Sequence, residues 1–206
     1  GTVRRELSII SSIIEYARTE WNQNLASNPV TAIKKPKASR SRNRILTDDE
    51  KERLLDALEQ YNPLMKLAVE FALETAMRRG ELMSLLWVNI NFEKCVAFLP
   101  MTKNGKSRSV PLSSKAIKIL KMLPRDIEGR VFPLNKSTVS SLFLRATRRA
   151  KVEDFRFHDL RHMALTRLSS KFTNILELAA ISGHRELKML QRYVHIKAED
   201  LVKKMM

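Results

Sequence analysis

Apolar residues recur at helical spacing over most of the chain, and the first such stretch is residues 3–21. The spacing predicts one amphipathic helix that ends near Asn28 and Pro29. The residues on its apolar face are Leu7, Ile10, Ile13, Ile14, Ala17 and Trp21. Such a face needs a surface to cover, and only Gly1 and Thr2 precede it. We therefore expect the chain to be a fragment of a longer protein.

A pair of helices is predicted after Thr47. Thr47 suits an N-cap, Glu50 stands three residues later, and leucines follow on one face. Pro63 suits the first turn of the second helix, whose apolar positions continue to Ala72. The same spacing predicts helices over 113–123, 138–150, 158–170 and 175–182 and in a stretch before Tyr193.

The pattern changes between Val88 and Leu112. Short runs rich in Val, Ile and Phe are separated by the segments NFEK and TKNGK, and Pro100 and Pro111 stand at the ends of runs. These runs predict a small antiparallel sheet. The expected fold class is therefore mainly α with one small antiparallel β-sheet (α+β).

A basic, polar segment divides the chain. Residues 34–44 read KKPKASRSRNR and contain no acidic residue, which predicts a linker over 34–46. We expect residues 1–33 before it and a main domain over 47–206 after it, with a C-terminal tail helix. The linker is either a solvated connector or a strap along a phosphate backbone, and the two are compatible. Its candidate DNA-binding residues are Lys34, Lys35, Lys37, Arg40, Arg42 and Arg44.

The net charge narrows the choice of partner. The 206 residues include 38 Lys and Arg against 22 Asp and Glu, a formal charge of +16, which predicts a polyanionic partner. The charge alone does not separate DNA from RNA or a membrane surface. No apolar run approaches the roughly 20 residues that span a bilayer, and no signal segment opens the chain, so a cytoplasmic protein is expected. The single cysteine, Cys95, cannot form an internal disulfide, and we expect no catalytic role for it.

Three segments carry candidate chemistry, and the first two are rich in arginine or histidine. Arg78 and Arg79 stand where an apolar helix meets Gly80, although two arginines alone are more often solvated. His158, Arg161 and His162 share one helical face in the second segment. This face is either a zinc site, which lacks the glutamate of HExxH and a clear third ligand, or a His–Arg pair that binds a phosphate ester.

The third segment ends in a tyrosine. Gly183 ends a predicted helix, His184 follows it, and Tyr193 comes nine residues later among basic residues. A tyrosine hydroxyl has a pKa near roughly 10, so it becomes a nucleophile only when cations stabilise the phenolate or a base accepts its proton. Arginines and histidines from the other segments could do both.

Together the three segments resemble the tyrosine recombinase, or phage integrase, family. The family's TG-x-R-x-x-E-L box is matched from Thr75 to Leu82 with Ala76 in place of glycine, a change expected to be mild because alanine leaves room for close packing. The H-x-L-R-H box is matched in full from His158 to His162. The Gly-His box with a tyrosine nine residues on is matched by Gly183, His184 and Tyr193, with Ser182 where leucine is common.

A fourth element of the resemblance lies on the predicted hairpin. The family places a lysine on a turn ahead of an R-x-V-P-L run, here Arg108 to Leu112, and Lys103 fits better than the competing Lys106. The resemblance covers about residues 47–196. Residues 1–33 resemble only the last helix of the family's separate core-binding, DNA-gripping domain, and we expect them to be its remnant.

The resemblance implies a site-specific DNA recombinase that works without metal, cofactor or ATP. Tyr193 would attack a DNA phosphate and form a 3′-phosphotyrosyl link with a free 5′-hydroxyl. Arg78 and Arg161 would bind the non-bridging oxygens, and His184 would add a hydrogen bond. Lys103 would protonate the leaving 5′-oxygen, and His158 would assist proton transfer at Tyr193.

The resemblance also implies supporting residues and an assembly. Glu81 is expected to be a structural partner of Arg78, His162 a support for its helix, and His195 an exposed residue. The expected partner is double-stranded DNA, bound by a homo-tetramer on synapsed sites and by a monomer off DNA, in the nucleoid of a prokaryote or in a phage context. The tail 197–206 would dock on a neighbouring subunit or pack on its own domain. The rival functions are a type IB topoisomerase and a DNA-binding relative without catalysis.

Overall fold

The structure, a computed structural model, describes residues 2–21, 23–37, 42–100, 107–172, 174–194 and 202. The chain forms two compact units, Gly1–Arg42 and Asn43–Met206, called here the N-terminal and C-terminal units. The boundary between them lies within the basic segment 34–46. No helix in the described residues is both long and apolar enough to cross a membrane.

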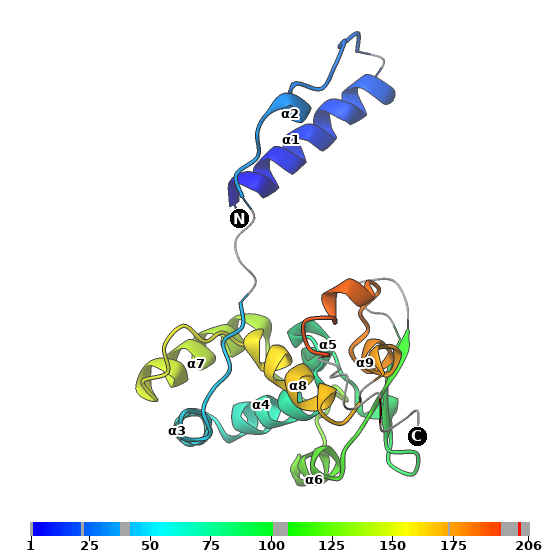
Figure 1. The fold of residues 1–206 in the computed structure, drawn as a ribbon. Helices are drawn as coiled ribbons and strands as arrows, with labels where there is room; N and C mark the ends of the chain where they lie inside the picture. The colour runs from blue at the N-terminus through cyan, green and yellow to red at the C-terminus, as the bar shows by residue number, and fades with distance from the viewer. Residues whose placement is uncertain are drawn as a thin grey trace. The chain divides into compact units, whose positions relative to one another are not determined.

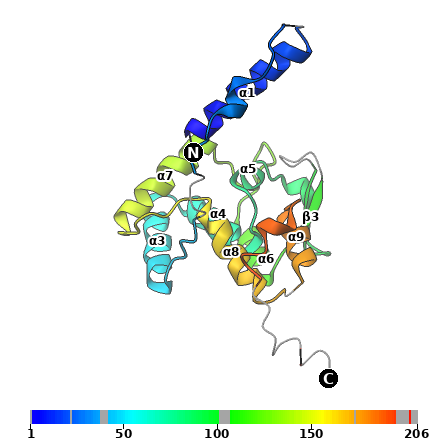
Figure 2. The same cartoon turned by 45° about the horizontal axis from the view of Figure 1, so that its top comes forward.

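The N-terminal unit consists of α1 (Thr2–Thr19) and the short α2 (Pro29–Ala32), which pack together (Figures 1 and 2). The first predicted helix is confirmed, but its predicted end is wrong, because α1 stops at Thr19. Asn28 starts α2 instead. Its side chain accepts a hydrogen bond from Val30 N at 3.1 Å and donates one to Ser11 O at 2.9 Å. Asn followed by Pro is therefore a helix-start signal here.

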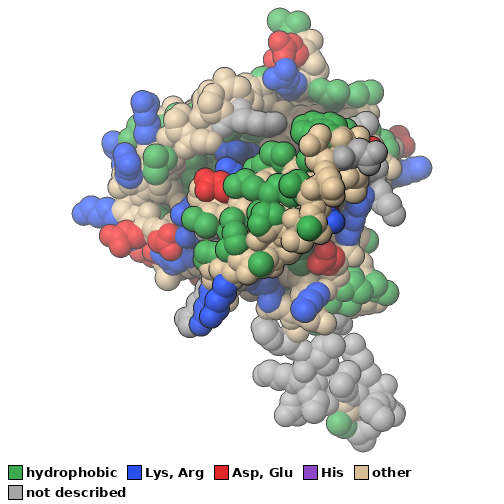
Figure 3. Space-filling view, turned by 90° about the horizontal axis from the view of Figure 1, so that it is seen from above, with side chains coloured by type: hydrophobic (Ala, Val, Ile, Leu, Met, Phe, Trp, Pro, Cys, Tyr) green, Lys and Arg blue, Asp and Glu red, His purple; other side chains and the backbone are tan. Residues whose placement is uncertain are grey.

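The apolar face of α1 is exposed. No residue of α1 is buried, and Ile9, Ile10 and Ile13 are 53%, 47% and 55% exposed. The space-filling view in Figure 3 shows hydrophobic side chains exposed at the surface. The sequence pattern predicts that another surface covers this apolar face of α1. Among the described residues, the face is exposed.

The C-terminal unit begins with the predicted pair of helices, α3 (Asp48–Tyr61) and α4 (Pro63–Thr75). The capping box at the start of α3 is complete. Thr47 Oγ1 accepts a hydrogen bond from Glu50 N at 3.1 Å, and Glu50 Oε2 accepts one from Thr47 N at 3.0 Å. Pro63 occupies the first turn of α4. Both predicted helix starts are confirmed.

The predicted sheet is present and has three antiparallel strands in the order β1 (Ile90–Asn91), β2 (Val96–Leu99) and β3 (Arg108–Pro111). Ala97 pairs with Val110 and Leu99 with Arg108, and Ala97 and Val110 are fully buried. A single turn of 3₁₀ helix, η1 (Trp87–Asn89), leads into β1. Residues 101–106, with Lys103 and Lys106, lie outside the described residues.

The remaining helices surround this sheet and α4 (Figures 1 and 2). They are α5 (Arg79–Met83), α6 (Ser114–Met122), α7 (Lys136–Arg149), α8 (Asp159–Ser169), α9 (Ile175–Ser182) and the 3₁₀ turn η2 (Leu187–Met189). The mainly helical fold with one small antiparallel sheet is confirmed. The predicted tail helix over 197–206 lies outside the described residues except Val202.

Two apolar clusters hold the C-terminal unit together. The larger fills the space between α3, α4, the sheet, α6 and α7. The smaller joins the end of α4 to α8 and α9 and to the segment before Tyr193, which packs against it. Its buried members are Ala76, Ala164, Leu165, Leu178 and Leu190. This small cluster brings together segments that are distant in the sequence.

Ala76 ends α4 in the left-handed conformation, with φ 52° and ψ 23°. A glycine at this position would therefore also meet a demand of the backbone, which the expectation based on packing room did not include. A non-glycine residue in this conformation costs about 1–2 kcal/mol. The Ala76 methyl group is fully buried in the smaller cluster, which offsets part of that cost.

Substitutions of Ala76 should separate these effects. Ala76→Gly should change the free energy of unfolding by less than about 1 kcal/mol, because relief of the left-handed strain opposes a lost methyl contact and a more flexible unfolded chain. Ala76→Val should lower it by more than about 2 kcal/mol, because a β-branched residue at positive φ adds strain in a buried site. Urea unfolding measures both, and equal stability of the valine variant and the wild type would contradict this account.

Candidate active site

The site is built around one buried carboxylate, that of Glu81 on α5. Arg108 of β3 donates to both oxygens, from Nη1 to Oε1 at 2.8 Å and from Nη2 to Oε2 at 2.9 Å. Arg78 donates to the same group from Nη1 and from its backbone N, each at 2.8 Å. Burial raises the pKa of Glu81, but the hydrogen bonds and charges of Arg108 and Arg78 prevail and bring it to about 2. Glu81 is therefore ionised at neutral pH.

Arg108 received no role from the sequence beyond its place in the R-x-V-P-L run. In the structure its Nε also donates to Ile181 O of α9, at 3.3 Å. One signal could have found it: Arg108 and the buried Val110 stand two residues apart on one face of a strand, which points the arginine inward. An arginine that points into the protein needs hydrogen-bond acceptors or an anion there, and Arg108 finds both in Glu81 and Ile181 O.

Arg161 of α8 is 4% exposed and is held by two helix ends. Nη1 donates to Ala76 O at the end of α4, at 2.6 Å, and Nη2 to Ser182 O at the end of α9, at 2.7 Å. Carbonyls at helix C-termini lack partners within the helix and attract cations. Burial, with the charge of Arg78 nearby, lowers the pKa of Arg161 to about 9, so its guanidinium stays charged at neutral pH.

Gly183 fits the site for two reasons. It ends α9 with φ +69°, a conformation that side chains rarely adopt. A Cβ atom there would also lie 2.8 Å from Arg108 Nη1. Its carbonyl accepts a hydrogen bond from Arg78 Nη2 at 3.1 Å, so the glycine turn contacts two of the three arginines.

His184 follows this turn and is positioned by Ser182. The Nδ1 atom of His184 lies 2.7 Å from Ser182 Oγ and 3.4 Å from Arg161 Nη2. The Ser182 hydroxyl is fully buried and donates to Leu178 O at 2.6 Å. Burial and then the charges of the surrounding arginines lower the pKa of His184 to about 4, so its ring is neutral at neutral pH while the site is empty.

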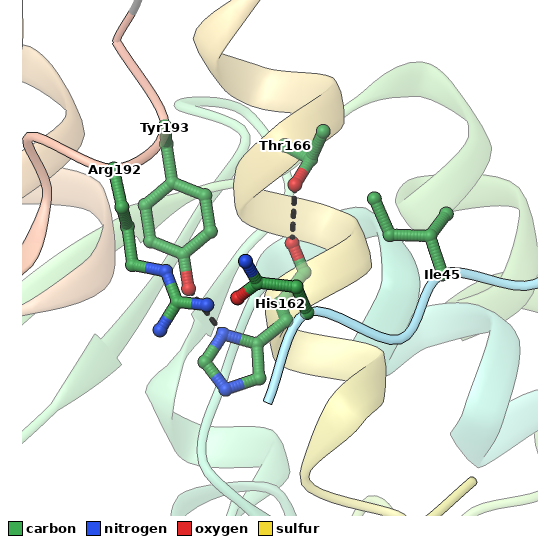
Figure 4. Close-up of a pocket in the computed structure, with 6 residues that line it drawn as sticks. Ile45, His162, Thr166, Arg192 and Tyr193 are labelled. Atoms are coloured by element: carbon green, nitrogen blue, oxygen red, sulfur yellow. Dashed lines mark hydrogen bonds between the residues drawn. The ribbon is translucent and has the colours of Figure 1, made fainter. Parts of the chain in front are cut away.

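Tyr193 lies in a pocket of about 160 Å³ beside α8, shown in Figure 4. Its hydroxyl is hydrogen-bonded to Nδ1 of His162, and the two rings stack with centroids 6.0 Å apart. The guanidinium carbon of Arg192 lies 5.4 Å from the tyrosine ring centroid. Burial raises the pKa of Tyr193, against the opposing charges of Arg192 and Arg161, so the hydroxyl is protonated at neutral pH.

The structure therefore places His162, and not His158, at the tyrosine hydroxyl. His158 stands at the N-cap of α8, and its ring meets that of His162 edge to face at 5.5 Å. His162 lies one turn further along α8, where Tyr193 and Val194 pack against the smaller cluster. Burial and the charge of Arg161 lower the pKa of His158. Among the described residues no group of three His, Cys, Asp or Glu could hold a metal ion.

The remaining candidates lie elsewhere. Lys103, Arg40 and His195 are outside the described residues. Lys34, Lys35 and Lys37 are exposed in the N-terminal unit, to which Arg42 also belongs. Arg44 belongs to the C-terminal unit and has internal partners there: an ion pair with Glu50 and hydrogen bonds to Ile45 O at 2.7 Å and Glu153 O at 3.4 Å. Its contacts anchor the chain beside α3.

The site has an excess of positive charge. Arg78, Arg108 and Arg161 contribute three charges and Glu81 removes one, which leaves a binding place for an anion beside the histidines and Tyr193. The arrangement brings together a tyrosine hydroxyl, a neutral histidine in contact with it, and guanidinium groups, which are the types of group that can attack, accept a proton and bind an anion.

Comparisons with known proteins identify the family. Residues 44–200 match the model of the phage integrase family, and the chain belongs to that family. It is 44% identical over 206 residues to a shufflon-specific DNA recombinase of Escherichia coli. The match covers 100% of this chain and 53% of that relative. It is 31% identical over 217 residues to a tyrosine recombinase of Thermosipho africanus, with 99% of the chain and 76% of the relative covered. The chain thus spans about half the length of the Escherichia coli relative.

Solved structures show the same fold. A lambda integrase fragment (residues 75–356), solved as a dimer bound to a COC′ core site, superposes with a TM-score of 0.75 at 23% identity, covering 93% of this chain and 72% of that one. The Tn1549 transposon integrase (residues 82–397, with a Y379F change), in complex with transposon right end DNA, gives 0.75 at 17% identity, covering 99% and 78%.

The Glu81 network should control stability in acid. A folded-state pKa of about 2 against an ordinary 4.5 means that this carboxylate stabilises the fold above pH 4.5 and loses that effect as the pH falls toward 2. The contribution at neutral pH is about 2–3 kcal/mol. Glu81→Gln should lower the free energy of unfolding by that order at pH 7 and flatten its dependence on pH between 5 and 2.

Glu59→Gln is the matched control, since Glu59 is 49% exposed and forms an ion pair with Lys66 on the surface. It should cost less than about 1 kcal/mol. Urea unfolding at a series of pH values measures both variants, and an identical acid dependence in Glu81→Gln and the wild type would contradict the role assigned to Glu81.

Proposed function

We propose that the protein is a site-specific DNA recombinase that cleaves and rejoins DNA through Tyr193. The observation that carries the proposal is a tyrosine hydroxyl, hydrogen-bonded to a histidine, in a site that also holds Arg78, Arg108 and Arg161 around the carboxylate of Glu81. Family membership and the DNA recombinase named among the relatives support it. The lambda integrase structures were solved on a core site and, as a tetramer, on a Holliday junction, which supports duplex DNA as substrate and assembly on DNA.

The proposed reaction exchanges one phosphodiester for another. Tyr193 Oη attacks the phosphorus and loses its proton, the bond from phosphorus to O5′ breaks, and O5′ leaves with the electron pair and takes up a proton. The DNA 3′ end stays linked to the tyrosine. Because a phosphodiester replaces a phosphodiester, no external energy source is required, and the free 5′-hydroxyl can reverse the step on a new strand.

The arginines have donors left for the phosphate. A guanidinium carries five N–H donors. Arg161 uses one on Ala76 O and one on Ser182 O, and Arg78 uses one on Glu81 and one on Gly183 O. The remaining donors would bind the non-bridging oxygens and stabilise the charge that develops in the transition state. Arg108 uses three donors on protein groups and is chiefly a positioning residue.

His184 would join the phosphate through its remaining ring nitrogen. Its Nδ1 is engaged by Ser182, so Nε2 is the atom available to the substrate. A bound phosphate would raise the pKa of His184 by offsetting the arginine charges that lower it. Lys103 as the donor to O5′ remains a prediction from the family resemblance.

The two units would divide the work. We infer that residues 1–33 are the last helix of a core-binding domain, whose exposed apolar face meets the rest of that domain, and that the basic residues of segment 34–46 lie along the DNA backbone. The C-terminal unit would cut DNA in the nucleoid of a prokaryote. A tetramer joined by exchanged tails is the proposed active assembly.

Covalent capture tests the proposal. A nicked suicide duplex, selected from random sequences by binding to the protein, should give an SDS-resistant protein–DNA adduct whose yield EDTA does not change. Tyr193→Phe should abolish the adduct because the nucleophilic oxygen is gone, while DNA affinity changes by less than about tenfold.

Tyr61→Phe, at an exposed tyrosine on α3, is the matched control and should keep full adduct yield. An adduct that persists in Tyr193→Phe would place the nucleophile elsewhere. No adduct with wild-type protein on a duplex that it binds would favour a DNA-binding protein without catalysis.

A further inference from the structure

The proton that leaves Tyr193 has a nearby acceptor in the structure. The pocket of Figure 4 is lined by Asn43, Ile45, His162, Thr166, Arg192 and Tyr193. Amide, aliphatic, hydroxyl and guanidinium groups are not bases near neutral pH. The imidazole of His162 is thus the one group among these lining residues that can take up a proton, and its Nδ1 already contacts the tyrosine hydroxyl.

We propose that His162 is the general base of strand cleavage, a role that rests on the proposed function of the site. In the neutral Nε2–H tautomer, Nδ1 of His162 accepts the hydroxyl proton while Tyr193 Oη forms its bond to phosphorus. The imidazole becomes imidazolium, and the electron pair of the breaking P–O bond leaves on O5′. In rejoining, the imidazolium returns the same proton to the departing tyrosine oxygen.

The position of His162 on α8 fixes this geometry. Its ring stacks on that of Tyr193, and the half-buried tyrosine packs against the smaller apolar cluster, so this packing holds the tyrosine ring beside the imidazole. His158, one turn earlier along the chain, contacts the His162 ring edge to face, with centroids 5.5 Å apart. The described contacts pair the tyrosine hydroxyl with His162.

The environment of His162 disfavours transfer of the Tyr193 proton to it while the site is empty. Burial, then Arg192, His158 and Arg161, lower the pKa of His162, while Asp159 acts in the opposite direction. Burial raises the pKa of Tyr193. In the empty site the proton therefore stays on the tyrosine, and the enzyme carries no reactive phenolate. The negative charge of a bound phosphodiester offsets Arg161 and Arg192 and makes the imidazolium favourable.

The test is the single-turnover rate of adduct formation on the suicide duplex with saturating protein. His162→Ala should slow it by about 10²–10⁴-fold, the usual contribution of a positioned general base. His162→Gln should be similarly slow, because an amide can hold the hydroxyl by a hydrogen bond but cannot accept its proton. His158→Ala is the matched comparison, one imidazole removed from the same helix, and should lose less.

A second substrate separates attack from departure. In a 5′-bridging phosphorothiolate, sulfur replaces the leaving oxygen, and its departure does not require a proton. The defect of His162→Ala should persist on this substrate, because the missing proton transfer is at the attacking oxygen. Unchanged DNA affinity and thermal unfolding would show that the variants are folded.

Two results would overturn the role of His162. One is a rate for His162→Ala or His162→Gln within about threefold of wild type. The other is recovery of the His162→Ala rate on the phosphorothiolate, which would move the residue to the leaving group. Adduct formation by the wild type tests the proposed function, whereas the ratios between variants test His162, so the two failures are distinguishable.

Discussion

The shared carboxylate of Glu81 is the interaction on which the rest of the site depends. Arg78, the N-cap of α5, and Arg108 on β3 both donate hydrogen bonds to this carboxylate. The negative charge between them offsets the repulsion of the two guanidinium groups. Arg108 in turn lies against Gly183, and the glycine carbonyl holds Arg78. One buried negative charge thereby connects α5, β3 and the end of α9.

Helix ends supply the second constraint. Arg161 joins the last carbonyls of α4 and α9, where helix dipoles favour a cation. The left-handed residues Ala76 and Gly183 turn the chain at these ends. The positive charge that remains after Glu81 is counted has two effects. It suits a phosphate, and it helps to keep His158, His162 and His184 neutral until an anion arrives.

Much of this could be predicted from the sequence, where local signals decide the outcome. The capping box at Thr47, Pro63 in a first turn and the change to strand-like runs after Val88 depend on neighbouring residues, and each is confirmed. Motif spacing identified the family, which the family model confirms.

Local signals could not predict contacts between distant segments. Arg108 is 27 residues from Glu81 and His162 is 31 residues from Tyr193, so only the packing of β3 and α8 pairs them. The end of α1 was missed because Asn28 and Pro29 were interpreted as a stop signal, whereas they start α2. The strain at Ala76 was missed because it depends on the backbone conformation at the end of α4, which residue types alone do not reveal.

The central claim is that the oxygen of Tyr193 becomes bonded to the 3′ end of DNA. Cleavage after Arg192 and Lys197 by trypsin isolates this tyrosine in the peptide Tyr193–Lys197. The adduct is trimmed with nuclease, and its tryptic peptides are analysed by mass spectrometry. A 3′-linked nucleotide is expected on that peptide alone. A nucleotide on any other peptide, or one linked through its 5′ carbon, would contradict the claim.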